Sequence, residues 1–407
     1  MDTNPKGLAA RESRLSKQLS LLESYSLQLF IFSFLISIGS FAFADSGRDQ
    51  QSNQTLWQQE RQPAWLQRAL QDDKQLPELN LHAPRVPKDR QSWALAFDND
   101  LLVPGHRDQD YTYGINFTQT GIAPEKASLA FAQLLSTVDD WLGNNHLHNA
   151  GSIETFSREY GAFGFTPEDI TVSTPNANDR PYASLLYASN SREQIDLVNN
   201  VAWKSTFTLG LLGLGVVGEL QNLAHKSTAG TKAEGWDNQI SDGGEITARY
   251  VIARQQYFDQ LSDNLEIKST TQASVGYLTE ASWGLSLRTG RIHSPWSSFN
   301  PELASYGEKS SFSGSAKAVN EHFFWAGFAI KARAYNTFLQ GQFRTSEVTY
   351  EHHQLRPILL EAWAGYTFAF KQGYRISYVL RGHSSEIKQG AGDRNLLWGG
   401  IIIARHI

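Results

Sequence analysis

The chain has 407 residues, which is long enough for two soluble domains or for one large barrel. It contains no cysteine, so a disulfide framework and thiolate chemistry are both excluded. The net charge is −5 and no long basic run occurs, which argues against nucleic acid as the main partner.

The first 44 residues have the order of a secretory signal. An apolar run from Leu27 to Ala44 ends in Ala-Phe-Ala, and it follows scattered basic residues, namely Lys6, Arg11, Arg14 and Lys17. Because the run is short for a membrane span, we predict a cleaved signal peptide over residues 1–44; the alternative is a single transmembrane anchor. Residues 45–90 are rich in Gln, Asp, Arg and Pro, and we expect a poorly structured periplasmic or surface extension.

The pattern of apolar and polar residues changes at Ser92. In "SWALAFDN" and "YTYGINFTQT" large apolar residues alternate with smaller or polar ones, and similar runs recur as far as "NLLWGGIIIARHI" at the end. Such alternation, with polar connectors and aromatic residues near strand ends, is typical of outer-membrane barrels. We therefore predict an all-β fold for residues 91–407, a transmembrane antiparallel β-barrel of about 12 strands. A secreted β-sandwich or a soluble barrel is the alternative.

The first polar cluster that alternation does not require follows the first predicted strand. Asn99 and Asp100 stand at the strand end, and Asp108 and Asp110 lie beyond it. Carboxylate and amide oxygens on a strand end and its loop suit a hard cation such as Ca²⁺. The alternative is a solvated turn, because Asn-Asp is a common turn pair.

The second polar cluster is "NDRPYAS", in which Arg180 precedes a proline and a predicted strand. An arginine at a barrel rim can bind phosphate through two parallel hydrogen bonds. The alternative is an ordinary loop arginine.

The third cluster is "VVGELQNLAHK", residues 216–226, which we expect to form a short helix among the strands. Gln221 and His225 are four residues apart and share one helix face. Such an amide can orient the imidazole ring or a substrate carbonyl. Glu234, just before a Gly-Trp turn, is placed to orient the histidine or to ligate a metal. Since no Gly-x-Ser-x-Gly motif marks a serine nucleophile, histidine plus metal points to activated water.

Together, and in this order, the clusters resemble the lipid A 3′-O-deacylase family of Gram-negative outer membranes. The matching segments are Asn99-Asp100, "DYTYG" with Thr112, "NDRPYAS" with Arg180, "ELQNLAH" with Gln221 and His225, and "GWDNQ". The resemblance covers most of residues 92–407. It implies an outer-membrane barrel whose site lies between the wall and a short helix from an extracellular loop. It also implies calcium-dependent removal of the 3′-acyloxyacyl group of lipid A.

Catalytic roles follow from the resemblance. His225 would be the general base, and Gln221 would support the histidine or the substrate. Asn99, Asp100 and Thr112 would belong to the calcium and oxyanion-stabilising region, with Asp100 and Asn99 as metal ligands. The implied cofactor is therefore Ca²⁺.

Substrate contacts are also implied by the resemblance. Arg180 would hold a phosphate of lipid A, and Glu234 would be a further member of the substrate-binding site. Asp179 stands where a second basic residue would suit a phosphate better, which leaves the substrate detail open. The expected partners are lipid A or lipopolysaccharide and outer-membrane lipid.

Other functions stay open. A phospholipase A-type outer-membrane esterase would use a serine–histidine pair on the outer wall, and no serine stands out beside a strand histidine. A non-enzymatic porin or structural barrel would need a charged lumen, whereas only 19% of the residues are charged. An inactive member of the deacylase family would keep the residue types without the geometry.

Overall fold

The computed structural model describes residues 91–104, 110–122, 130–142, 152–196, 198–228, 231–262, 264–309 and 320–406. The predicted signal peptide, residues 1–44, and the predicted extension, residues 45–90, lie outside these ranges.

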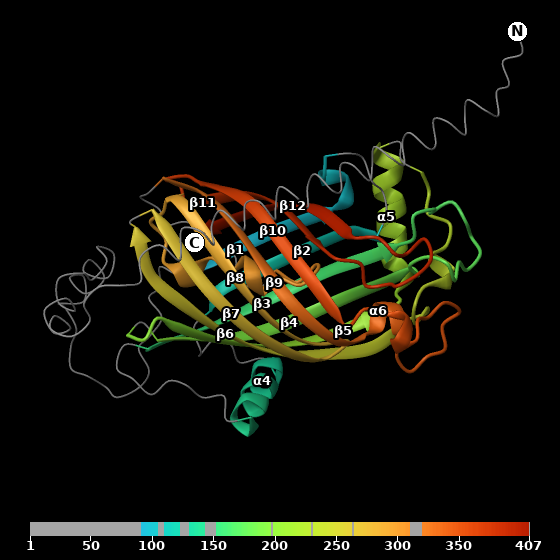
Figure 1. Cartoon of the computed structure of the whole chain (residues 1–407), viewed down its shortest axis with the longest axis horizontal. Helices are drawn as coiled ribbons and strands as arrows, with labels where there is room; N and C mark the ends of the chain where they lie inside the picture. Colours follow the sequence, from blue (N-terminus) through green and yellow to red (C-terminus); the bar gives the residue numbers. More distant parts are fainter. Residues whose placement is uncertain are drawn as a thin grey trace, which may run out of the picture. The chain divides into compact units, whose positions relative to one another are not determined.

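Within the described ranges, twelve antiparallel strands form one closed barrel (Figure 1). They are β1 (Ser92–Asn99), β2 (Asp110–Ile122), β3 (Ser152–Thr166), β4 (Ala183–Asp196), β5 (Val201–Leu212), β6 (Glu245–Ser262), β7 (Leu265–Gly276), β8 (Leu278–Arg291), β9 (Glu321–Asn336), β10 (Ile358–Ala369), β11 (Tyr374–His383) and β12 (Leu396–His406). Strands β1 and β12 close the ring, with Ser92 paired to His406 and Asn99 to Gly399. The predicted transmembrane antiparallel barrel is confirmed.

Short helices occur in the connections. Within the described ranges, the α-helices are α4 (Ala130–Trp141), α5 (Gly215–Thr228) and α6 (Thr337–Gln340). The 3-10 helices are η3 (Asp100–Leu102), η5 (Trp236–Asn238), η6 (Trp296–Ser298), η7 (Pro301–Leu303) and η8 (His352–Gln354). The helix expected at residues 216–226 is α5. None of the helices in the described ranges has both the length and the apolar character needed to cross a membrane.

The two ends of the barrel differ in their connections. The end that carries α5 has the β3–β4, β5–β6, β9–β10 and β11–β12 loops and one tight turn, β7–β8. The opposite end has the tight β4–β5, β6–β7 and β10–β11 turns, together with two long connections, β2–β3 and β8–β9. Outer-membrane barrels place long loops outside the cell and tight turns in the periplasm. Most of the connections follow this rule when the α5 end is taken as extracellular, which places Ser92 and His406 at the periplasmic end.

The wall alternates as a lipid-facing barrel should. On β10, Leu360, Tyr366 and Phe368 are exposed, whereas Glu361 and Trp363 between them are buried. Because successive residues of a strand point to opposite faces, the exposed set faces outward and the buried set faces the lumen.

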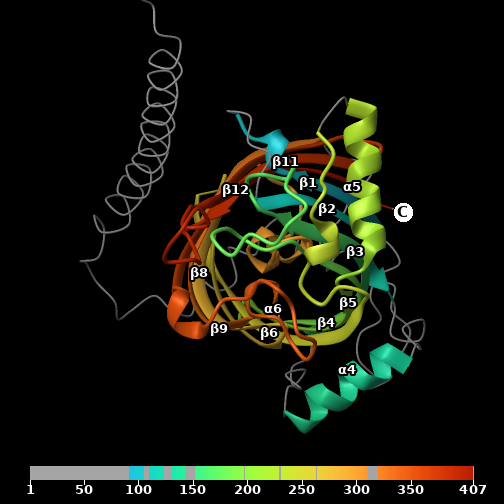
Figure 2. The same ribbon diagram turned by 90° about the vertical axis from the view of Figure 1, so that its right-hand side faces the viewer.

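The lumen is occupied by the long β8–β9 connection, part of which appears in orange inside the ring of strands (Figure 2). Glu308 of this connection accepts a hydrogen bond from Tyr277 at 2.7 Å and pairs with Arg249 at 2.8 Å. Its neighbour Lys309 pairs with Asp98 of β1. A porin needs a water-filled lumen, so this packing disfavours the porin alternative.

Candidate active site

Asn99 and Thr112 are joined at the extracellular end of the wall. Asn99 ends β1 and caps η3, because its amide oxygen accepts a hydrogen bond from the Leu101 N–H at 2.7 Å. Its amide nitrogen donates to the Thr112 carbonyl oxygen on β2 at 2.5 Å. Asp100, the next residue, is fully buried in the first turn of η3. Three residues proposed from the sequence are thus brought together by the β1–β2 pairing.

A bulge in β2 decides which side chains of this segment face outward. The register with β3 shifts between Tyr111 and Tyr113. Tyr111 enters the lumen cluster of aromatic residues, whereas Tyr113 packs outside against α5. On β3, Phe165 belongs to the lumen cluster, so the next residue, Thr166, points outward. The Thr112 hydroxyl lies 2.6 Å from the Thr166 hydroxyl and is therefore on the same side. Bulges are common beside active sites because they redirect a side chain, and here Thr112 joins the outer face.

Helix α5 lies against this outer face (Figures 1 and 2). The Tyr113 hydroxyl donates to the Val217 carbonyl oxygen on α5 at 2.8 Å. Val217 is fully buried against Tyr113, Tyr182 and Trp236. Gln221 is one turn further along and is also buried, so α5 presents a face of buried residues to the loop and wall.

The Gln221 side chain is held in one orientation by Trp236. Its amide oxygen accepts a hydrogen bond from the Trp236 indole N–H at 2.7 Å. Its amide nitrogen is buried and has no hydrogen-bond partner among the described residues. Trp236 packs edge-on against Tyr182 with ring centroids 5.0 Å apart. A Cβ at Gly218 would lie 2.5 Å from the indole, so glycine permits this close approach. The sequence offered "GWDNQ" as a signal but did not reveal this contact.

His225 lies on α5, one turn beyond Gln221, and its side chain is outside the described residues. Its relation to Asn99 and Asp100 therefore stays a prediction.

Arg180 lies on the lumen side at the barrel mouth. Its guanidinium is 1% exposed, pairs with Glu386 at 2.6 Å, and lies over the ring of Phe165. Asp110, at the start of β2, is 3.7 Å from the same guanidinium. In this position the group is not presented to a ligand outside the wall, because its charge is already balanced in the interior. The lipid A phosphate contact expected of Arg180 stays a prediction that this geometry does not favour.

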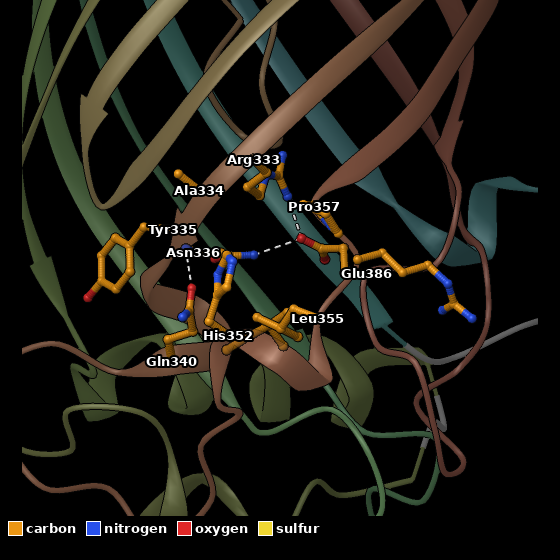
Figure 3. Close-up of a pocket in the computed structure, with 11 residues that line it drawn as sticks. Arg333, Ala334, Tyr335, Asn336, Gln340, His352, Leu355, Pro357 and Glu386 are labelled. Atoms are coloured by element: carbon orange, nitrogen blue, oxygen red, sulfur yellow. Dashed lines mark hydrogen bonds and ion pairs between the residues drawn. The ribbon is translucent and has the colours of Figure 1, made fainter.

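Glu386 is the centre of this buried network, and it borders the small pocket shown in Figure 3. It accepts hydrogen bonds from Arg180 at 2.6 Å and Asn336 at 2.8 Å, and it pairs with Arg333. The pocket has a volume of about 10 Å³, which admits one water molecule at most. It is too small for an acyl chain, so the network serves the structure of the mouth.

We expect Glu386→Ala to lower the free energy of unfolding by about 3–5 kcal/mol, because it leaves buried cations uncompensated. Burial alone would raise the pKa of Glu386, but Arg180 and Arg333 attract its carboxylate and lower that pKa overall. The stabilisation is therefore complete above the usual glutamate pKa of about 4.3 and is lost as the pH falls toward the lowered value. Denaturant unfolding of the protein in vesicles measures both effects. The control is Glu347→Ala, which removes an exposed loop carboxylate; equal losses in the two variants would contradict the prediction.

Glu234 is placed on the loop that returns from α5. Its backbone N–H donates to the Ile170 carbonyl oxygen at 2.9 Å, and its carboxylate pairs with Lys232 at 2.8 Å. The carboxylate is 43% exposed. A contact with substrate, histidine or metal stays a prediction for Glu234.

Calcium was expected at Asp100 and Asn99. Their carboxylate and amide oxygens are of the kind that Ca²⁺ prefers, and the Asp100 side chain is fully buried. Within the described ranges, no three Asp, Glu or His side chains gather as a metal site. Since Ca²⁺ takes about 6–8 oxygens, backbone carbonyls or water would have to complete its shell. The two residues fit the ion as partial ligands, and the calcium site stays a prediction.

Comparison with known proteins places this geometry in a family. The sequence profile of the family described as outer membrane protein LpxR matches residues 70–406. The chain belongs to the LpxR family. The resemblance drawn from the sequence motifs is thereby confirmed, and the protein is located in the outer membrane of a Gram-negative bacterium. Membership of the LpxR family supports an enzyme related to lipid A.

A solved structure of an LpxR protein agrees with this family in fold. LpxR from Salmonella typhimurium matches with a TM-score of 0.58 at 17% sequence identity, over 78% of this chain and 100% of that one. The β domain of the Bordetella autotransporter Brka gives a TM-score of 0.38 at 11% identity, over 78% of this chain and 99% of that one. Among curated proteins, none matches this sequence.

Proposed function

We propose that this LpxR family member hydrolyses the 3′-O-linked acyloxyacyl ester of lipid A, with water activated by His225 and with calcium required. The observation that carries the proposal is a chain of contacts on the outer wall. It runs from Asn99 through the Thr112 carbonyl to β2, and from Tyr113 to α5, which holds Gln221. An acyl chain of a membrane lipid can reach such a site directly from the bilayer.

Each side chain has a task in this proposal. His225 accepts a proton from the attacking water at its imidazole and later returns a proton to the leaving sugar oxygen. The Gln221 amide nitrogen, whose direction is set by Trp236, donates a hydrogen bond to the ester oxygen as it becomes negative, or to the imidazole. Calcium, when held by Asp100 and Asn99, would polarise the ester carbonyl. Burial at the wall strengthens these interactions because water is excluded.

The reaction is tested by mass spectrometry of lipid products. The purified protein in vesicles is given lipid A and, separately, phospholipid. The proposal expects lipid A to lose its 3′-acyloxyacyl group and phospholipid to stay intact. Release of fatty acid from phospholipid alone would favour the phospholipase A-type esterase. No hydrolysis of either lipid, with ion conductance through the barrel, would favour the porin.

Trp236→Phe is expected to reduce kcat by about two- to tenfold, because it removes one hydrogen bond while keeping the aromatic ring against Tyr182. Gln221 would then rotate more freely and its amide nitrogen would be poorly aimed. The rate is measured as lipid A deacylation, with Trp283→Phe on the lipid-facing wall as the control. Equal rates for the parent and the Trp236 variant would show that the indole does not position Gln221.

A further inference from the structure

Helix α4 lies outside the barrel, against β4, β5 and β6, and the proposed reaction does not use it (Figure 2). It belongs to the β2–β3 connection, at the periplasmic end. The two views together show that it crosses the strands and runs around the wall rather than along the barrel axis. A helix in this position lies in the plane of the membrane.

The wall beneath α4 is unusually polar. Outward positions alternate along each strand, and Leu186, Leu209 and Leu211 show the usual exposed apolar residues. Nearer the periplasmic end of these strands, the outward positions are instead polar and buried: Asn190, Arg192 and Gln194 on β4, and Ser205 on β5. Polar groups facing acyl chains are costly, so this part of the wall needs a cover.

Asp139 binds α4 to the wall of the barrel. Its carboxylate is fully buried and accepts hydrogen bonds from the Tyr250 hydroxyl and the Ser205 hydroxyl, each at 2.7 Å. Arg192 lies 3.5 Å away and also pairs with Glu154 at 2.6 Å. The carboxylate of α4 thus satisfies wall groups that would otherwise face lipid, and the wall groups balance its charge.

The rest of α4 is divided between two faces. With 3.6 residues per turn, Leu134, Val138 and Trp141 form one stripe, and Gln133, Thr137 and Asp140 form the next. Leu134 is 45% exposed and Trp141 is 83% exposed. On the outer wall of a membrane barrel, such a large exposed apolar stripe has lipid as its natural surroundings.

We propose that α4 is an interfacial helix that seats the periplasmic half of the barrel in the phospholipid leaflet. The stripe of Leu134, Val138 and Trp141 enters the boundary between headgroups and acyl chains, and the stripe of Gln133, Thr137 and Asp140 faces the headgroups and water. The hydrogen bonds and ion pair of Asp139 hold the helix against the polar wall. An apolar stripe, a polar stripe and these Asp139 contacts are the three features that an amphipathic helix needs to lie on a membrane while fixed to a protein.

The absence of cysteine makes a direct test possible, because Trp141→Cys creates a unique labelling site. The full chain is labelled with an environment-sensitive fluorophore and refolded into phospholipid vesicles. One set of vesicles carries nitroxide near the headgroup end of the acyl chains, and another contains iodide on both sides. The matched control is Asp140→Cys, one residue away on the polar stripe.

We expect the lipid-borne nitroxide to remove about half of the fluorescence at position 141, since apolar faces of such helices sit roughly 5–10 Å into the interface. Iodide should instead quench the probe at position 140 more strongly. Equal lipid quenching at the two positions would overturn the proposal. Shielding of position 141 from both quenchers would also overturn it, and would point to a second copy of the chain as the cover.

The role of the Asp139 contacts is tested separately, in the Trp141→Cys variant. Asp139→Asn removes the buried carboxylate, and Asp140→Asn removes the exposed one beside it. We expect only Asp139→Asn to shift the quenching of the probe from nitroxide toward iodide, because α4 leaves the wall. Should Asp139→Asn prevent refolding, Ser205→Ala removes one of the hydrogen-bond donors to Asp139 and should produce a smaller shift in the same direction. No shift in either variant would show that Asp139 does not hold α4 against the wall.

Discussion

Replacing His225 with alanine is expected to slow lipid A deacylation by about 10²–10⁴-fold while leaving the barrel folded, because a positioned general base contributes about that factor. The helix that carries the histidine is held by contacts elsewhere, at Val217 and Gln221, so α5 should stay in place. The measurement is mass spectrometry of lipid A after incubation with the purified variant in vesicles. Heat-modified migration on gels checks that the barrel is intact.

Two controls separate a catalytic role from a structural one. His352→Ala removes an exposed histidine from the same end of the barrel and should keep the parent rate. Added imidazole should restore part of the activity of His225→Ala, since a small base can replace the missing ring, whereas it cannot repair a displaced helix. If His225→Ala deacylates lipid A as fast as the parent, the assignment of the general base is wrong.

Removing calcium is expected to abolish deacylation. Asp100 and Asn99 supply oxygen ligands of the right kind, and the ion would stabilise negative charge on the ester oxygen in a site sheltered from water. The protein is treated with EGTA, assayed, and assayed again after calcium or magnesium is returned. We expect calcium to restore the rate and magnesium to fail, because magnesium demands a tighter octahedral shell.

Asp100→Asn provides the matched variant for this experiment. It preserves the shape of the side chain but removes the negative charge, so it should raise the calcium concentration needed for half of full activity. Asp140→Asn, an exposed carboxylate on the opposite half of the barrel, should leave that concentration unchanged. Full activity in EGTA with magnesium restored would exclude the calcium role.

The barrel and the site helix were predictable because they depend on local patterns. Alternation of side chains has a period of two residues on any strand, so runs such as "SWALAFDN" mark wall strands without knowledge of their partners. The i, i+4 spacing of Gln221 and His225 likewise follows from helix geometry alone. Family membership then agreed with the motifs that contained Asn99, Thr112 and Arg180.

Two features could not be predicted because distant residues decide them. Arg180 looked like a rim residue, yet it is drawn into the lumen by Glu386, more than two hundred positions away. The polar outward positions of β4 interrupt the alternation expected for a lipid-facing wall. Their explanation lies in α4, which covers them from another connection and was not expected from the sequence.

By itself, then, the sequence determined the barrel, its membrane and the residue types available for chemistry, since those depend on periodicity and composition. Only the tertiary structure decided which polar residues belong to the outer site and which to the lumen. One physical reason is that the bulge between Tyr111 and Tyr113 changes which side chains of β2 face outward. The other is that a buried charge pairs with an opposite charge that is near in space, whatever their separation in sequence.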